Sequence, residues 1–384
     1  MHRFLSAMLL ISCAASAQVD PTQLANRIVT SSIKVKPGQA VVIFGGKHTV
    51  GWMEALAIEA EKAGGQTTLF LNTDRIMRSR FTEVPEQYLG QPPMYFAEWL
   101  KHVDVWIGLP GIEDAKAVFA DIPEARFEKA AKAGQVVDNM LNDSPIKAIF
   151  INLPTEQSAR NDGIEFARLQ EIIHAGMMSD HEQIASLGNR LKDRLSAAKV
   201  HVTSPNGTDF TFETGQRPIF VDDGMLTEEK AKSKLALGRF VSLPGGVLSV
   251  APIEESANGK VVVPRTTCRW EPMTNVQFEL KGGKLQRFQA EKGGDCFEKS
   301  IAPYAGPKDR FGYFSIGLNP GIGVVENPGD YRPDNGAGVI WMGVGDNRLM
   351  GGANDTVGGF SFPILNATVE VNGKTVIKAG KLTD

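Results

Sequence analysis

The sequence has little histidine and little cysteine. Six histidines and three cysteines occur among 384 residues, and no histidine follows His201. A Cys/His zinc centre needs three or four such residues at set spacing, which the second half of the chain does not contain. We expect His102, His174, His181 and His201 to be structural.

Long apolar runs and basic clusters are also absent after the first residues. No later stretch reaches the length of a transmembrane helix. A net charge of −3 without a concentrated basic run argues against a general nucleic-acid or anionic-membrane binder. With 42% hydrophobic residues, a chain of this length can bury substantial cores, and its size predicts two domains.

The first residues have the pattern of an export signal. Met1 to Gln18 (MHRFLSAMLLISCAASAQ) has one Arg, a short apolar stretch and small residues at Ala15 and Ala17. This pattern favours a signal peptide, residues 1–17, cleaved after Ala17. The alternative is a lipoprotein signal, in which Cys13 becomes the lipidated first residue. Either predicts an exported protein, periplasmic or secreted.

Residues 18–200 alternate strand-like and helix-like segments. The rhythm predicts an α/β domain with a parallel sheet and helices on both faces. Ile184 begins an apolar stripe at helical spacing that predicts the closing helix. The expected strands are residues 40–44, 67–71, 103–108 and 148–153, and the expected helices before the closing one are residues 52–63, 94–102 and 124–133.

Residues 201–384 are rich in short β-like runs separated by Gly, Pro and Asn, which predicts a mainly β domain with a boundary near His201. Gly282 and Gly283 join two strand-like runs as a hairpin signal. Cys268 and Cys296 lie nearly symmetrically about this turn, so extending the two strands would bring them almost opposite each other. In an oxidising compartment they are candidates for a disulfide, with two buried free thiols as the equal alternative.

Three Gly-rich segments carry a family resemblance. They read SLPGGVLSVAP from Ser242, GYFSIGLNP from Gly312, and GAGVIWMGVGDNRLMGGANDTVGGFS from Gly336. In order and spacing they resemble the thermophilic-type metallo-aminopeptidases (leucyl aminopeptidase or aminopeptidase T), whose segments read like LPxGEVFTAP, GExGIGxNP, GTxHxALG and GGxNxSxxHxD. The resemblance implies a two-domain fold, a homodimer and a metal site in the C-terminal domain.

The ligand positions of that family hold other residues here. The resemblance places its two glutamates at Val247 and Tyr313, one histidine at Trp341, and a further His and Asp at Gly359 and Ser361. Val and Gly side chains have no lone pair, Trp donates only an N–H, and neutral Tyr or Ser is a poor zinc ligand. We therefore predict no metal site and no cofactor, and we doubt hydrolysis through a metal-bound water.

The two aromatic replacements could either fill the former metal cavity or line a pocket for an apolar, aromatic or cationic group. Each further candidate has a structural alternative. Glu255 lies beside a blank segment, Arg348 could bind a carboxylate while Asn354 fixes its loop, and Gly45-Gly46-Lys47-His48 follows the first strand. The pocket candidates are Tyr313, Trp341, Glu255, Asn354, Arg348 and His48.

Two functions follow as hypotheses. The first is an exported aminopeptidase-like protein, a pseudoenzyme that binds a peptide or small amine-bearing ligand in the former metal cavity. The alternative is an active leucyl-type metallopeptidase, or another hydrolase, that uses unrecognised ligands or new catalytic groups; a divalent metal is expected only in that case. Fold alone does not decide between them.

Overall fold

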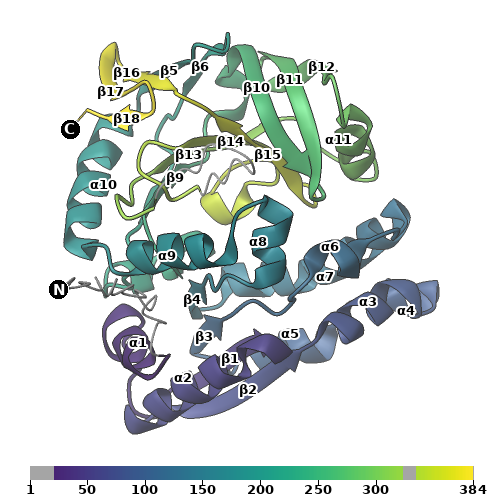
Figure 1. Cartoon of the computed structure of the whole chain (residues 1–384), viewed down its shortest axis with the longest axis vertical. Helices are drawn as coiled ribbons and strands as arrows, with labels where there is room; N and C mark the ends of the chain where they lie inside the picture. Colours follow the sequence, from purple (N-terminus) through teal and green to yellow (C-terminus); the bar gives the residue numbers. More distant parts are fainter. Residues whose placement is uncertain (1–20, 323–333, 384) are drawn as a thin grey trace, which may run out of the picture.

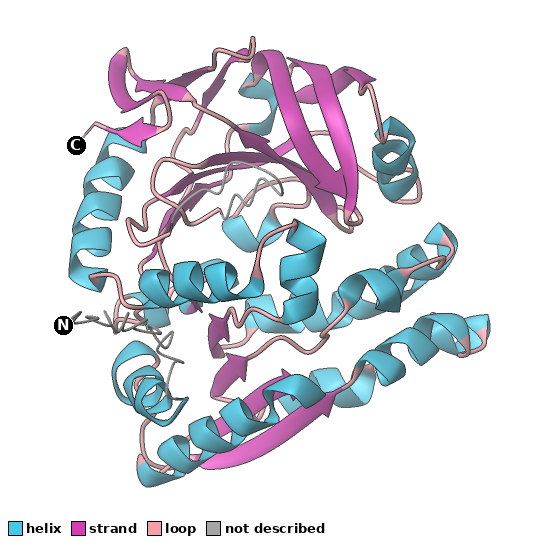
Figure 2. Cartoon of the chain, viewed as in Figure 1, coloured by secondary structure: helices cyan, strands magenta, loops and turns pink. Residues whose placement is uncertain are grey.

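The computed structural model describes residues 21–322 and 334–383, so the expected signal peptide, Cys13 included, lies outside the described residues. The chain forms an α/β part, at the bottom of Figure 1, and a mainly β part above it. Figure 2 shows that most helices belong to the first part and most strands to the second. The predicted fold class is confirmed.

The α/β part follows the predicted rhythm. Its strands β1 to β4 are parallel, and helices connect them. Its elements are α1 (Pro21–Arg27), β1 (Ala40–Gly46), α2 (Val50–Lys62), β2 (Gln66–Asn72), α3 (Asp74–Thr82), α4 (Glu86–Leu89), α5 (Met94–Leu100), β3 (Val105–Gly108), α6 (Ala115–Phe119), α7 (Glu124–Asp143), β4 (Lys147–Ile151), α8 (Glu156–Asp162), α9 (Phe166–Met177) and α10 (His181–Leu195).

Alternation along β1 explains why both faces of this sheet are covered. Val41 and Ile43 point to one side, where they join a core with α1, α2 and α9. Val42 points to the other side and packs with α5 and α7. Successive strand residues face opposite ways, so a sheet with apolar residues at consecutive positions must be covered on both faces.

The mainly β part contains two antiparallel sheets. One runs in the order β12-β11-β10-β6-β5-β16-β17-β18, and the other, here called sheet C, in the order β15-β14-β13-β9-β7. The elements after α10 in the chain are β5 (Lys199–Thr203), β6 (Asp209–Glu213), β7 (Ile219–Asp222), β8 (Phe240–Leu243), β9 (Val247–Val250), β10 (Asn258–Cys268), β11 (Glu271–Lys281), β12 (Lys284–Gln289), α11 (Gly294–Ile301), β13 (Phe311–Gly317), β14 (Ile340–Gly345), β15 (Gly359–Ile364), β16 (Thr368–Val371), β17 (Lys374–Lys378) and β18 (Lys381–Leu382).

One apolar core joins the two antiparallel sheets as a sandwich. Phe212 of β6 and Phe314 of β13 bring their ring centroids within 4.9 Å of each other. Met342 and Phe362, from β14 and β15, are also fully buried in this core. Because one face of sheet C is used in this packing, its opposite face, here called the outer face, remains available for a site.

Two connections fasten the parts together. β8 comes from beyond residue 201 yet pairs in parallel with β4, which adds a fifth strand to the first sheet. Asn319, after β13, is fully buried and donates to the carbonyls of Gly176 and Gly245 at 3.0 and 2.7 Å. The end of α9 and the Gly-rich turn before β9 are thereby held at fixed positions beside sheet C.

Cys268 and Cys296 form a disulfide, but the strand geometry expected for them is wrong. The hairpin at Gly282 and Gly283 does form, between β11 and β12. Cys268, however, ends the preceding strand β10, opposite Glu271, and Cys296 lies on α11. A tight turn between β10 and β11 causes the difference, since it places Cys268 one strand earlier. The bridge therefore joins a strand to a helix across 28 residues.

Among the described residues, no helix has the length and apolarity that crossing a bilayer requires.

Candidate functional site

The five positions at which the family resemblance implies metal ligands share the outer face of sheet C. Strand register establishes this, because directly paired residues and residues two apart face the same way. Tyr313 pairs with Gly343, which in turn pairs with Ser361. Ser315, two residues from Tyr313, pairs with Trp341. In the same way Val247 and Gly359 fall on this face through their partners Gly317 and Gly345.

Tyr313 covers the centre of this face. Its ring lies against Gly343, where an added Cβ would come within 2.1 Å of a ring carbon. Its hydroxyl donates a hydrogen bond to Ser361 Oγ at 2.6 Å. Burial, opposed by this hydrogen bond, raises the pKa of Tyr313 to about 12, so the phenol is neutral at physiological pH. Two of the implied ligand positions are thus joined to each other by neutral groups.

Trp341 adds a buried donor to the same face. Its indole Nε1–H has no hydrogen-bond partner among the described residues. An unpaired buried N–H costs free energy, so this group favours an acceptor such as a water or a ligand oxygen. An N–H donor cannot replace a histidine nitrogen as a metal ligand.

The residues present do not fit a pair of divalent cations. The five positions provide neither a carboxylate nor an imidazole. Within residues 21–322 and 334–383, no group of three or more His, Cys, Asp or Glu side chains is arranged to hold a metal ion. We therefore derive no chemical step through a metal.

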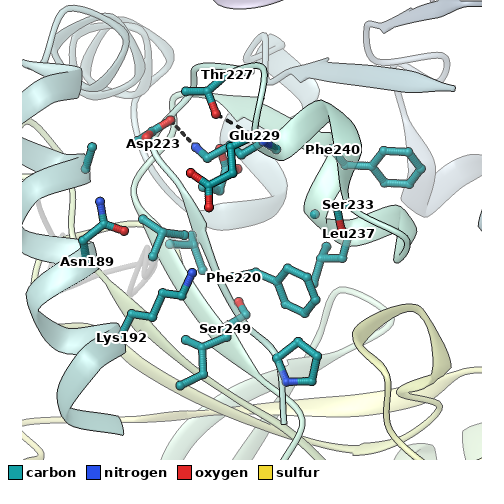
Figure 3. Close-up of a pocket in the computed structure, with 18 of the residues that line it drawn as sticks. Asn189, Lys192, Phe220, Asp223, Thr227, Glu229, Ser233, Leu237, Phe240 and Ser249 are labelled. Atoms are coloured by element: carbon teal, nitrogen blue, oxygen red, sulfur yellow. Dashed lines mark hydrogen bonds and ion pairs between the residues drawn. The ribbon is translucent and has the colours of Figure 1, made fainter. Parts of the chain in front are cut away.

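A cleft of about 810 Å³ lies at the β7 edge of sheet C. Figure 3 shows α10 with Asn189 and Lys192 on one side, Phe220 and Ser249 in the middle, and Leu237 and Phe240 on the other side. Val247 also lines the cleft, which connects it to the implied ligand positions. Among its described lining residues neither Tyr313 nor Trp341 appears.

Asp222 ends β7 and lines this cleft. It pairs across the strands with Val247, so it stands opposite the position of the family's first glutamate. Desolvation raises the pKa of Asp222 to about 6, although hydrogen bonds from Gly224 and Ser242 and the charge of Lys230 partly offset the effect. A carboxyl group with such a pKa changes its charge close to neutral pH.

Asp334 links the cleft to Tyr313 through its charge. It lines the cleft, and its negative charge contributes to the raised pKa of Tyr313. Desolvation raises the pKa of Asp334 as well. The cleft therefore contains two carboxyl groups that are easier to protonate than ordinary surface aspartates.

Glu254 is a buried carboxylate that holds a residue of the cleft wall, Arg217, in place. Its carboxylate, only 2% exposed, accepts hydrogen bonds from Arg217 at 2.7 Å, Asn347 at 3.0 Å and the Ala353 N–H at 2.6 Å. Burial alone would raise the pKa of Glu254, but these hydrogen bonds and the charge of Arg217 lower it overall. Since Arg217 lines the cleft, this network fixes the wall to the last Gly-rich loop.

The remaining sequence candidates lie outside the described cleft lining. Glu255 is exposed and pairs with Arg310 at 2.6 Å. Arg348 is engaged by Asp346 at 2.9 Å and Asp355 at 3.0 Å. Each of these charges is neutralised by a neighbour within the chain.

Asn354 and His48 also lie outside the described lining of the cleft. Asn354 is buried and donates to the carbonyls of Phe311 and Gly345 at 3.1 and 3.0 Å, which holds its loop in place. His48 follows β1 at the edge of the parallel sheet, and its Nε2 is buried without a partner among the described residues.

Sequence reasoning missed Asp222, Asp334 and Lys192. The sequence contained one signal for Asp222, because a short apolar run that begins at Ile219 is followed directly by two aspartates. Nothing in that run indicated that the first carboxylate would be desolvated. Of the groups that act on its pKa, Gly224 and Lys230 follow Asp222 closely in the sequence, whereas Ser242 comes from strand β8.

The fold thus has an α/β part and a β sandwich, and sheet C of the sandwich contains the strands of the three Gly-rich segments. The sequence model of the thermophilic metalloproteases (M29) matches residues 18–321. This chain belongs to that family. No curated protein matches the sequence.

Two solved structures share the fold. Wild-type AmpT from Thermus thermophilus has a TM-score of 0.71 at 16% sequence identity, over 95% of this chain and 99% of that one. A 2,5-dihydroxypyridine dioxygenase from Pseudomonas putida KT2440 has a TM-score of 0.60, also at 16% identity, over 96% and 98% of the two chains. Identities this low establish the fold alone.

Proposed function

We propose that this member of the M29 family is an exported binding protein without the family's metal-dependent hydrolysis. It holds a peptide or small amine-bearing molecule in the cleft that borders the former metal positions. The observation that carries this proposal is the outer face of sheet C, where the implied ligand positions provide no carboxylate or imidazole. The Tyr313–Ser361 hydrogen bond occupies its centre with neutral groups.

Metal content and turnover test this proposal together. Protein purified from its native compartment is analysed for zinc, cobalt and manganese, and aminoacyl-substrate turnover is measured before and after chelation. We expect less than about 0.1 equivalent of metal, because the ligand positions offer no suitable donors. Stoichiometric metal with chelator-sensitive turnover would overturn the proposal.

A second candidate is a hydrolase that uses carboxyl groups of the cleft. Asp222 favours it, because a carboxyl group with a pKa near 6 is suited to general acid–base catalysis. Turnover that is insensitive to chelators and lost in Asp222→Asn would support this candidate. Unchanged turnover in that variant would exclude Asp222 as its acid or base.

The disulfide supports the export part of the proposal, since such bonds persist in oxidising compartments. Mass spectrometry of the mature N-terminus distinguishes cleavage after Ala17 from lipidation at Cys13. A homodimer, which the resemblance implies, is tested by light scattering of the purified protein. A monomer at micromolar concentration would remove the dimer from the proposal.

A further inference from the structure

Asp222 is a cleft carboxylate that forms an ion pair with none of the described cations lining the cleft. The charge of Lys230 acts on Asp222, but the ammonium of Lys230 pairs with Asp223 at 2.6 Å and donates to the Met225 carbonyl at 3.0 Å. Asp222 accepts hydrogen bonds from neutral donors, the Gly224 N–H at 3.0 Å and Ser242. The described cations that line the cleft are Lys192, Arg217, Lys230 and Lys232, and none of them forms an ion pair with Asp222. A desolvated carboxylate of this kind gains from a cation that a ligand provides.

The walls around this carboxylate suit an apolar group. Phe150, Phe220 and Phe240 all line the cleft. Phe150 is 44% exposed although its residue type is usually buried, and its ring meets that of Phe240 edge to face at 5.8 Å. Aromatic rings attract both apolar groups and organic cations.

The cation that fits is organic rather than metallic. A metal ion needs several oxygen or nitrogen ligands, and the described residues contain no such cluster. A primary ammonium group needs only one carboxylate and a few neutral acceptors, and it can carry a ring into the aromatic part of the cleft. A volume of about 810 Å³ falls within the range of small-molecule pockets.

We propose that the cleft at the β7 edge binds a primary amine bearing an apolar or aromatic group, with Asp222 as the counter-ion of its ammonium. This inference rests on the proposed function and adds to it the site and the chemistry of recognition. It places the ammonium on the strand beside the former metal positions rather than on them. Asp222 thus provides a carboxylate directly opposite Val247, the position of the family's first glutamate.

Calorimetry with a matched pair of probes tests this inference. Phenethylamine carries an ammonium and a ring, and 2-phenylethanol has the same shape without the charge. At pH 7.5 we expect the intact protein to bind the amine about tenfold more tightly than the alcohol. Asp222→Asn should remove this preference and leave binding of the alcohol within about twofold, because the aromatic walls are unchanged.

Asp193→Asn is the control for general electrostatics. Asp193 lies at the rim of the same cleft but is exposed, so solvent screens its charge. Its variant should bind the amine within about twofold of the parent. A thermal unfolding curve shows that Asp222→Asn is folded before binding is compared.

Three results would overturn the inference. They are absence of amine binding to the intact protein at millimolar concentration, equal binding of amine and alcohol, and an equal loss of amine binding in both variants. The test is independent of the metal analysis. Metal-dependent turnover would refute the proposed function, whereas the dependence on Asp222 is read from binding alone.

Discussion

The centre of the outer face of sheet C presents neutral groups, whereas its β7 edge carries a carboxylate. At the centre, Tyr313 and Ser361 bind each other and present neutral groups where the family places metal ligands. At the edge, Asp222 keeps a carboxylate in the cleft, one strand away from Val247. The comparison shows that a carboxylate lies beside the implied ligand positions although those positions themselves are neutral. Metal binding at the centre and ligand binding at the edge can therefore be tested separately.

The largest loss of stability is expected from a change at Glu254, which holds the cleft-lining residue Arg217 in place. Glu254→Ala removes the buried partner of Arg217 and the acceptor for Asn347 and the Ala353 N–H. Breaking a buried ion pair from one side costs about 3–5 kcal/mol. Urea unfolding should show a loss of this size, and cleft binding should weaken because Arg217 loses its position.

Glu255→Ala is the control for that change. Its carboxylate pairs with Arg310 at the surface, where an ion pair contributes about 1 kcal/mol or less. If both variants lost the same unfolding free energy, the hydrogen bonds and ion pair of Glu254 would not stabilise the cleft as described.

The disulfide offers a perturbation outside both regions. Replacing Cys268 and Cys296 together by Ser opens a bridge across 28 residues, which should cost about 3–4 kcal/mol. Because the bridge joins β10 to α11, the ligand preference at the edge should remain unchanged at temperatures where the variant is folded. A thiol count with and without reductant verifies the bridge in the parent. A loss of amine binding in the folded variant would show that the edge depends on distant parts of the sandwich.

Local patterns in the sequence predicted the fold class and the four parallel strands, but they did not predict the helices α1, α3, α4, α6, α8 and α9. The alternation of strands and helices from β1 to β4 follows from periodicity and is confirmed, although α7 extends to Asp143 rather than ending at residue 133. The pairing of β8 with β4 was not predicted, because the partners are distant in sequence and a four-residue strand carries little signal. Local patterns identify elements but do not determine which distant strands pair.

The site was predictable only where the family segments mark it. Register places all five blank positions on one face, as a shared site requires. Asp222 could not be identified in this way, since its importance depends on desolvation of its carboxylate in the folded protein. Desolvation is a property of packing, so the edge of sheet C emerges only from the structure.

Asp222→Asn should raise the stability at neutral pH. The pKa of this group is 3.8 in the unfolded reference and about 6 in the folded protein, so folding favours its protonated form. The parent therefore loses stability as pH rises from about 4 to 6, by at most about 3 kcal/mol, and the Asn variant does not. The gain of the variant over the parent should be small at pH 4 and largest above pH 6.

The difference between parent and variant unfolding free energies at pH 4.5 and 7.5 measures this effect. Neighbouring charged and titratable groups, namely Lys230, Asp223, His181 and Asp334, are present in both proteins, so their contributions largely cancel. A variant that is less stable than the parent by the same amount at both pH values would assign Asp222 a structural role. Gained stability with lost amine binding would instead mark a functional group.

The smallest effect is expected at the centre. Tyr313→Phe removes one buried hydrogen bond to Ser361 and keeps the ring against Gly343, so unfolding should become easier by about 1 kcal/mol. Ser361→Ala should cost a similar amount, and the double variant little more than either single change, because both remove the same bond. Additive losses would mean that the two hydroxyls have separate partners and that the centre is open rather than closed. Amine binding at the edge should be the same in all three variants, since the centre contributes no charge to it.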